Sequence, residues 1–336
     1  MRGGVKVSGS RFRVPSRLAL NPKPGTLKPK PEIRNAKPCL FGQFVSTLRP
    51  FRPCDNKRTL HENRPYALIL NLLSLLNMDI LGVDIGGTGL KGAIVDVRSG
   101  ELRSERVRLE TPKPSTPERM TETFMELVQH LDWTGPVGCG FPAIVRHGVA
   151  HSASNIDKGW LGQNIEALFS KASGLHVAAL NDADAAGYAE MDFGKGKGQM
   201  GTVLLITIGS GIGTALFVDG REVPNTEFGH LIMHNMIAEH YVSNSARKKL
   251  DLSWEKWGKR FNEYLHHLER LLSPDMFILG GGISKDFDSY QKYLKVETPV
   301  TPAKLLNNAG IVGAAGYAYR RLVAEHTSSA QPQTGT

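Results

Sequence analysis

The sequence repeats one pattern twice: an apolar strand, a glycine-rich turn and a second apolar strand. The first copy spans residues 80–97 and the second spans residues 203–218. Further apolar runs at 103–109, 137–141, 177–180 and 276–279 predict strands, and the patterns at 116–131 and 182–191 predict helices. This alternation predicts an α/β protein built from two duplicated lobes with a cleft between them, and it argues against a helical bundle or a β-sandwich.

Basic residues are concentrated before Met78, where the composition changes. Residues 1–77 hold fifteen Lys and Arg against three acidic residues, a net charge of +12, whereas residues 78–336 hold 26 and 29, a net charge of −3. The first segment is rich in proline and lacks periodicity, which is typical of a disordered arm. Three interpretations stay open for it: an organelle transit peptide, a polyanion-binding tail, or sequence upstream of a true start at Met78.

Residues 78–336 contain one cysteine and no long apolar run. Cys39 and Cys54 lie in the arm and Cys139 stands alone in an apolar run, which excludes a disulfide framework or a Cys-rich zinc site in the body. No apolar run reaches the roughly 18 residues that a membrane-spanning helix needs. We therefore expect a soluble protein of the reducing cytosol, or of an organelle if the arm is a transit peptide, with neither a membrane nor a nucleic-acid partner.

The turn in the first repeat, residues 84–91, reads Asp-Ile-Gly-Gly-Thr-Gly-Leu-Lys. Glycines let backbone N–H groups approach a phosphate, a threonine adds a hydroxyl, and an aspartate can engage the hydration shell of Mg²⁺. The spacing fits neither a Walker A loop nor a dinucleotide fingerprint. The predicted phosphate-binding residues are Asp84, Gly86, Gly87, Thr88 and Lys91, with Asp84 as an indirect magnesium ligand; a plain glycine hairpin turn is the alternative.

The turn in the second repeat is also rich in glycine and follows a strand directly. Its predicted phosphate-binding residues are Gly209, Ser210, Gly211 and Gly213. Two such loops that face one another would form a cradle for a phosphate chain between the half-domains.

A carboxylate stands at the junction of a predicted strand and helix, in the sequence Asn181-Asp182-Ala-Asp184. Its position at the carboxyl end of a strand suits Asp182 to be a general base acting on a sugar hydroxyl, beside an amide that can hydrogen-bond a hydroxyl. The alternative is that Asp182 is a simple helix N-cap. Asp184 lies on a different face of the helix and is not assigned a catalytic role.

Glu227 and His230 are three residues apart and can point into one pocket, where they could bind adjacent hydroxyls. Zinc ligation by His230, His234 and His240 is the rival interpretation, but the spacing matches no common zinc pattern.

The strand at 276–279 ends in three glycines, and a helix rich in small residues follows at 309–319. Gly281 and Gly282 are therefore candidate contacts for polyphosphate or a nucleotide, and tight helix packing is the alternative.

These motifs, in this order, resemble the ROK family of sugar kinases and regulators, which has the actin-like (ribonuclease H-like) ATPase fold. The resemblance covers residues 79–320 and implies an N-terminal lobe over 78–182, a C-terminal lobe over 183–323 and a disordered tail over 324–336. It implies that Asp182 is the catalytic base, that Mg²⁺ is the cofactor and that the protein is a homodimer. It further implies that glucose is bound by Asn155, Asn181, Glu227 and His230.

The resemblance is closer to the glucokinases of this family that use polyphosphate, through the stretches at 155–162, 181–187, 224–230 and 310–315. The Cys-rich zinc motif of other members is absent, which removes zinc, and Ala143 and Ser210 replace a usual glycine and threonine. A polyanionic donor needs a basic track, for which Lys195 and Lys197 are tentative residues; a solvated flexible loop is the equal alternative.

The expected reaction is transfer of the terminal phosphoryl group of inorganic polyphosphate, or of ATP, to the C6 hydroxyl of glucose, which gives glucose 6-phosphate. A strictly ATP-dependent glucokinase is the main alternative. A sugar-responsive regulator would need a helix-turn-helix before Met78, which the proline-rich arm cannot supply. A non-catalytic sugar-binding module would be expected to lose Asp182 or the glycine loops, and both are present.

Overall fold

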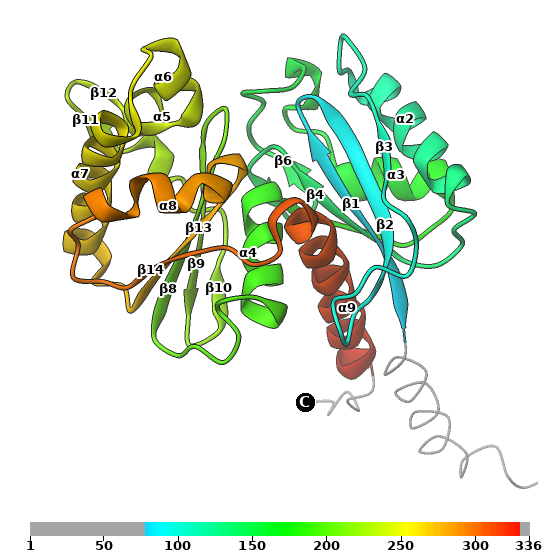
Figure 1. The fold of residues 1–336 in the computed structure, drawn as a ribbon. Coiled ribbons are helices and arrows are strands. Elements are labelled where there is room, and N and C mark those ends of the chain that lie inside the picture. The colour runs from blue at the N-terminus through cyan, green and yellow to red at the C-terminus, as the bar shows by residue number, and fades with distance from the viewer. Residues whose placement is uncertain (1–77, 330–336) are drawn as a thin grey trace, which may run out of the picture. The chain divides into compact units, whose positions relative to one another are not determined.

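The computed structural model describes residues 78–329, which belong to one unit of the chain (Figure 1). The predictions made for residues 1–77 and 330–336 lie outside the described residues. The first repeat forms a five-stranded sheet in the order β3-β2-β1-β4-β7. Its strands are β1 (Asp79–Gly86), β2 (Gly89–Asp96), β3 (Val107–Leu109), β4 (Val137–Phe141) and β7 (Val177–Asn181).

The second repeat forms a five-stranded sheet in the order β10-β9-β8-β13-β14. In both sheets the first three strands of the repeat are antiparallel neighbours and the last two run parallel to the first. The predicted duplication is therefore confirmed strand by strand. The strands are β8 (Thr202–Ile208), β9 (Ile212–Val218), β10 (Arg221–Val223), β13 (Met276–Gly280) and β14 (Val300–Pro302).

Helices cover both faces of each sheet because the strands are apolar on both sides. In β1, Leu81 and Val83 pack with α2 (Pro117–His130) and α3 (Ile165–Ser173), whereas Ile80 packs with α9 (Ala309–Ser329). In the second sheet, α7 (Trp254–Leu272) covers one face and α4 (Asp182–Phe193) the other. Helices α4 and α9 contact each other and lie between the two sheets (Figure 1).

Glycines allow α9 to approach the first sheet closely. A Cβ atom at Gly82 or Gly138 would collide with the backbone carbonyls of Ile311 or Ala314 in α9. This contact fixes the height of α9 against the sheet, and with it the position of the first residues of α9 at the cleft.

The remaining strands and α-helices are short. They are β5 (Val145–Arg146), β6 (Val149–Ala150), β11 (Ile232–Met233), β12 (Met236–Ile237), α5 (Ala238–Val242), α6 (Asn244–Lys249) and α8 (Phe287–Tyr290). No helix within residues 78–329 is both long and apolar enough to cross a bilayer.

Two predicted boundaries differ from the structure. The strand expected over 103–109 is reduced to Val107–Leu109, because residues 103–106 form no regular ladder: Leu102 makes an isolated bridge to Val95, and the Ile94 N–H bonds the Ser104 side chain. Helix α9 continues to Ser329, beyond Val323, where we expected the folded chain to end. The helical segment 324–329 therefore corrects the predicted start of the disordered tail.

Candidate functional site

Two cavities meet at three residues in the cleft: Asp182, Thr207 and Gly281. The first cavity, about 290 Å³, is lined by hydroxyl, amide and carboxylate side chains and by the glycines of the second repeat. The second cavity, about 260 Å³, is lined by Asp84, Lys91, small residues and the first residues of α9. A group held at the junction is therefore accessible from both cavities.

Asp182 stands at this junction because β7 ends and α4 begins there. The N-cap of α4 is Asn181, whose Oδ1 accepts hydrogen bonds from the backbone N–H groups of Ala183 (2.8 Å) and Asp184 (3.2 Å). The alternative in which Asp182 is the N-cap is therefore wrong. Because Asn181 caps the helix, the Asp182 side chain is left free to face the cavities.

The environment of Asp182 opposes its negative charge. Burial within the protein raises the pKa of this carboxyl, and the nearby charges of Asp84 and Glu227 raise it further, from 3.8 to about 7, against a hydrogen bond from the Ala183 N–H. A carboxyl group with a pKa near the working pH is well matched to accept a proton in catalysis.

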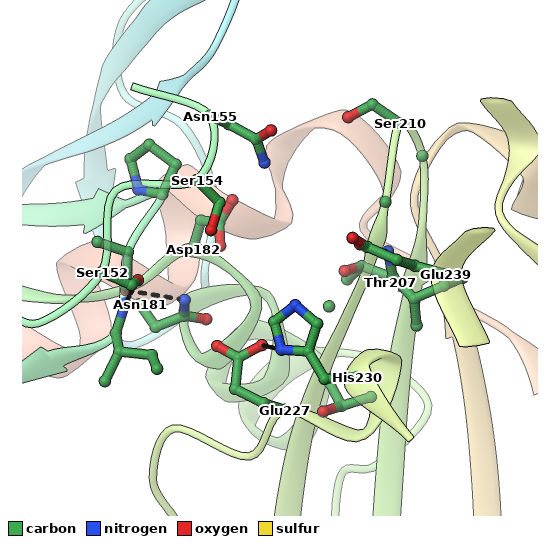
Figure 2. Close-up of a pocket in the computed structure, with 18 of the residues that line it drawn as sticks. Ser152, Ser154, Asn155, Asn181, Asp182, Thr207, Ser210, Glu227, His230 and Glu239 are labelled. Carbon is green, nitrogen blue, oxygen red and sulfur yellow. Dashed lines mark hydrogen bonds and ion pairs between the residues drawn. The ribbon is translucent and has the colours of Figure 1, made fainter. Parts of the chain in front are cut away.

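Glu227 and His230 lie together in the first cavity, as their spacing predicts (Figure 2). The Nδ1 atom of His230 is 3.5 Å from Oε2 of Glu227. Burial raises the pKa of Glu227, the charge of Glu239 raises it as well, and His230 opposes both effects. The cavity thus places carboxylate oxygens next to an imidazole, a combination that suits a ligand with several adjacent hydroxyls.

Asn155 and Asn181 also line the first cavity. Asn155 points toward the opening from the side that carries Asp182, opposite Ser210 and Glu239 (Figure 2). The Nδ2 atom of Asn181 donates to the carbonyl oxygen of Ala143 at 3.0 Å. Since its oxygen is already used by the helix cap, Asn181 has only its second amide hydrogen left to offer a ligand.

The three histidines named as a rival zinc set face different carboxylates. His230 faces Glu227, His234 lies 3.0 Å from Glu263, and His240 lies 3.9 Å from its neighbour Glu239. Within residues 78–329, no three His, Cys, Asp or Glu side chains gather in a way that could hold a metal ion.

Asp84 and Lys91 face each other across the β1–β2 hairpin, with Lys91 Nζ 2.9 Å from Asp84 Oδ2. The Asp84 carboxyl lies against Gly310 in the first turn of α9, where a Cβ atom would be 2.8 Å from Cγ. The second cavity therefore combines a carboxylate, an ammonium group and the first turn of α9.

The predicted glycine residues are divided between the two cavities. Gly209, Ser210, Gly211 and Gly213 line the first cavity, and Gly282 lines the second. Gly281 contacts both, and only glycine fits there: its φ is +75° and a Cβ atom would lie 2.5 Å from the Ile208 carbonyl oxygen.

The rest of the first loop does not line either cavity. Gly86, Gly87 and Thr88 form the tip of the β1–β2 hairpin, and a Cβ at Gly87 would contact the Asn155 backbone at 3.5 Å. Only Asp84 and Lys91 of this loop reach a cavity, so the two glycine loops are not equivalent walls of one cradle.

Lys195 and Lys197 lie in the loop that follows α4, at the end of the helix opposite Asp182, and neither lines a cavity. The backbone N–H of Lys195 donates to Oε2 of Glu190 at 2.9 Å, and Glu190 does line the second cavity. The backbone of Lys195 is therefore in contact with a residue that lines the second cavity.

The sequence analysis missed several side chains at the first cavity. The most notable is Glu239 in α5, whose Oε2 accepts from the Ile212 N–H at 3.4 Å and lies 2.5 Å from where Gly211 would carry a Cβ. Ser152, Ser154 and Thr207 were missed as well. No spacing links these residues to Asp182 in the sequence. Thr207 was the only one with a local signal, because it lies near the end of the strand before the second glycine loop.

The known proteins most similar to this chain include curated kinases. A polyphosphate glucokinase of Mycobacterium tuberculosis is 45% identical over 197 residues, which cover 58% of this chain and 74% of that protein. A polyphosphate glucokinase of Mycobacterium leprae is 43% identical over 197 residues, which cover 58% of this chain and 61% of that protein.

Solved structures give the same fold. An inorganic polyphosphate/ATP-glucomannokinase from Arthrobacter sp. strain KM is 47% identical, has a TM-score of 0.70 and matches 73% of this chain and 100% of that chain. A ROK family glucokinase from Streptomyces griseus, in complex with glucose and AMPPNP, is 24% identical with a TM-score of 0.62, over 72% of this chain and 100% of that one. This second likeness concerns the fold alone.

The duplicated sheets and the helices between them define the actin-like ATPase fold, as predicted. Residues 80–241 match the ROK family. Together with the 45% identity to a relative of which it covers 74%, this match shows that the chain belongs to the ROK family.

Proposed function

We propose that this protein transfers the terminal phosphoryl group of inorganic polyphosphate, and also that of ATP, to the C6 hydroxyl of glucose, forming glucose 6-phosphate. The observation that carries the proposal is the position of Asp182 at the junction of a cavity suited to a sugar and a cavity suited to phosphate. The identity to polyphosphate glucokinases and to a polyphosphate/ATP-glucomannokinase supports both donors.

In this reaction Asp182 is the catalytic base that accepts the proton of the glucose hydroxyl. Its pKa of about 7 supports the role, because the group is largely ionised at slightly alkaline pH and still basic enough to take a proton. Catalysis then depends mainly on holding the acceptor hydroxyl in line with the donor phosphate.

The sugar is held by Asn155, Asn181, Glu227 and His230, to which we add Glu239. All five line the first cavity. Two carboxylates accept hydrogen bonds from sugar hydroxyls, and the amides and the imidazole can donate to them.

The donor phosphates bind in the second cavity, near Lys91 and the N-terminus of α9, and reach the junction past Gly281 and Gly282. The loop at 209–213 closes the same junction from the side of the first cavity. Phosphate binding by Gly86, Gly87 and Thr88 stays a prediction, and these residues line neither cavity.

Mg²⁺ is the metal we propose for this reaction. Asp84 is the acidic residue best placed to hold it, and the described residues offer no cage of three or more ligands. This donor set fits Mg²⁺, which keeps several waters and is often bound by one carboxylate together with substrate phosphates. When bound, the ion would neutralise charge on the transferring phosphoryl group.

Lys195 and Lys197 are proposed to guide a long polyphosphate chain where it leaves the second cavity. In the K195A/K197A variant we expect the KM for long-chain polyphosphate to rise and to become less dependent on salt, because fewer cations contact the polyanion. The KM for ATP, whose three phosphates end inside the cavity, serves as the internal control. An equal rise in both KM values would contradict the role.

The experiment that tests the proposed function measures glucose 6-phosphate formed from glucose with polyphosphate or with ATP, each with Mg²⁺, after nucleotide has been removed from the polyphosphate. Product from both donors is the expected result. Product from ATP alone would leave a strictly ATP-dependent glucokinase, and product from neither would refute the proposal. We also propose that the protein is a homodimer, which light scattering on the purified chain would test.

A further inference from the structure

A pair of carboxyl groups, one buried and one partly buried, lies next to the segment that lines the first cavity. Asp184 in α4 is only 2% exposed, and burial and the nearby charge of Glu222 in β10 raise the pKa of its carboxyl. Neither residue lines either cavity. The proposed mechanism therefore leaves this pair without a role.

One proton shared by the two groups would satisfy the remaining oxygens of the pair. Oδ2 of Asp184 accepts the Asn225 N–H at 2.9 Å, and Oε2 of Glu222 accepts the Tyr188 hydroxyl at 2.9 Å. Within residues 78–329, the other two oxygens, Oδ1 of Asp184 and Oε1 of Glu222, are buried and receive no N–H or O–H donor. Because two ionised carboxylates repel each other, one proton held between them satisfies both oxygens.

Asn225 connects this pair to the sugar cavity and to the opposite lobe. It has a positive φ of +57°, and its side chain bonds both backbone groups of Val145 in β5, with Oδ1 accepting at 2.8 Å and Nδ2 donating at 2.9 Å. The next two residues, Thr226 and Glu227, line the first cavity. Asn225 thus joins the segment that carries Glu227 to the first sheet's lobe, and Asp184 holds its backbone.

We propose that Asp184 is a positioning residue for sugar binding: its carboxyl, sharing one proton with Glu222, fixes Asn225 and thereby orders the segment that brings Glu227 to the sugar. The inference rests on the proposed function, because it assigns Glu227 to the sugar. Loss of the shared proton leaves two buried like charges and loosens the Asn225 connection.

The charges around the pair determine the direction of its pH dependence. Burial raises the pKa of Asp184, and the charges of Glu222 and of Asp182 raise it further, while the Asn225 hydrogen bond opposes them. Burial also raises the pKa of Glu222, whereas the Tyr188 hydroxyl and the charge of Arg320 in α9 lower it. Tyr317 lies beside Tyr188. A raised pKa in the folded protein means that the ordering is complete at lower pH and is lost as the pH rises through that pKa.

The test compares glucose binding by calorimetry, without donor, at about pH 7 and about pH 9 in the full-length protein. For the wild type we expect the Kd for glucose to be higher at the alkaline pH. In Asp184→Asn and in Glu222→Gln an amide replaces the shared acid and has no proton to lose at these pH values. Both variants should therefore lose the alkaline rise, and Asp288→Asn, an exposed site in α8, should retain it.

Asp184→Ala removes the acceptor of the Asn225 N–H altogether. We expect it to raise the Kd and the KM for glucose about tenfold at neutral pH, with a smaller effect on kcat. If this variant does not fold, the two amide variants still decide the question through the ratio of Kd values at the two pH values.

An Asp184→Ala variant with a lowered melting temperature but an unchanged glucose KM would show that the pair only stabilises the fold. The inference would also be overturned if the Kd for glucose rose at alkaline pH in both amide variants as much as in the wild type. If the wild type neither binds glucose nor forms glucose 6-phosphate, the proposed function falls together with this inference. If the wild type does both and only the variants behave unexpectedly, this inference falls alone.

Discussion

The replacement Asp182→Asn should make the protein more stable and nearly inactive. Asparagine keeps the size of the side chain and removes a buried negative charge that the folded protein holds at a cost. A pKa raised from 3.8 in the ordinary carboxyl to about 7 in the folded protein corresponds to at most about 4 kcal/mol of destabilisation once the group is ionised. Solvent that enters the two cavities lowers this figure, because Asp182 borders both.

The size of this stabilisation depends on pH, because it follows the ionisation of Asp182. The folded protein binds the Asp182 proton more tightly than the unfolded chain, so the cost is absent below about pH 4 and complete above about pH 7. Denaturant unfolding should show the variant more stable by about 2 to 4 kcal/mol at pH 8 and by about 2 kcal/mol or less at pH 5. The hydrogen bond from the Ala183 N–H can be kept by the asparagine oxygen, so it does not reverse the sign.

The same substitution removes the proposed base. We expect glucose 6-phosphate formation to fall by about 100-fold to 10,000-fold, while glucose binding by calorimetry persists. Asp192→Asn, a replacement of the same kind at the other end of α4, is the matched control. A variant that kept more than about a tenth of wild-type turnover, or that gained equal stability at both pH values, would refute the reasoning.

Three further outcomes follow from the site. The kcat should rise with pH through about 7, because Asp182 must lose its proton to act as a base, and a rate profile that is flat from about pH 6 to pH 8 would contradict this. The Glu239→Gln change should raise the KM for glucose about tenfold with little effect on the KM for polyphosphate, whereas Glu263→Gln, which lines neither cavity, should change neither. Gly281→Ala should cost roughly 1 to 3 kcal/mol more than Gly220→Ala in thermal unfolding, because both have a positive φ but only the first places its Cβ against a carbonyl oxygen; equal costs would argue against that contact.

The duplicated fold could be predicted because each repeat carries its information locally. Apolar strands, glycine turns and helix patterns lie within short windows, so β1, β4, β7, β8 and β13 fall where they were expected. The extent of β3 could not be predicted, since alternation over 103–109 does not reveal where the strand leaves its partner. The end of α9 was also missed, because the small-residue pattern that marked the helix stops before the helix does.

The site was harder to predict than the fold because its geometry depends on which of two neighbours caps a helix. Asn181 and Asp182 are both good N-cap residues, so the sequence allowed either. The structure decides the matter through backbone conformation: Asn181 is extended, with φ −62° and ψ 148°, and Asp182 is the first helical residue. Glu239 was missed for a different reason, since it reaches the cavity from a short helix that carries no glycine motif.

Helix α4 explains why the two cavities share one carboxylate. It is buried between the two sheets, with small residues such as Ala185 and Gly187 allowing close packing against α9 and the second sheet. Because α4 is packed between the two sheets, residues on its different faces contact different parts of the protein. Asp182 faces both cavities, and Asp184 binds the segment that carries Glu227. Because both carboxyls sit on the same rigid turn, a shift of α4 that brought Asp182 nearer to the donor would also pull on Asn225 and the sugar side. The proposed base and the proposed sugar ligands are therefore coupled through one helix, and substitutions along α4 should change phosphoryl transfer and sugar affinity together.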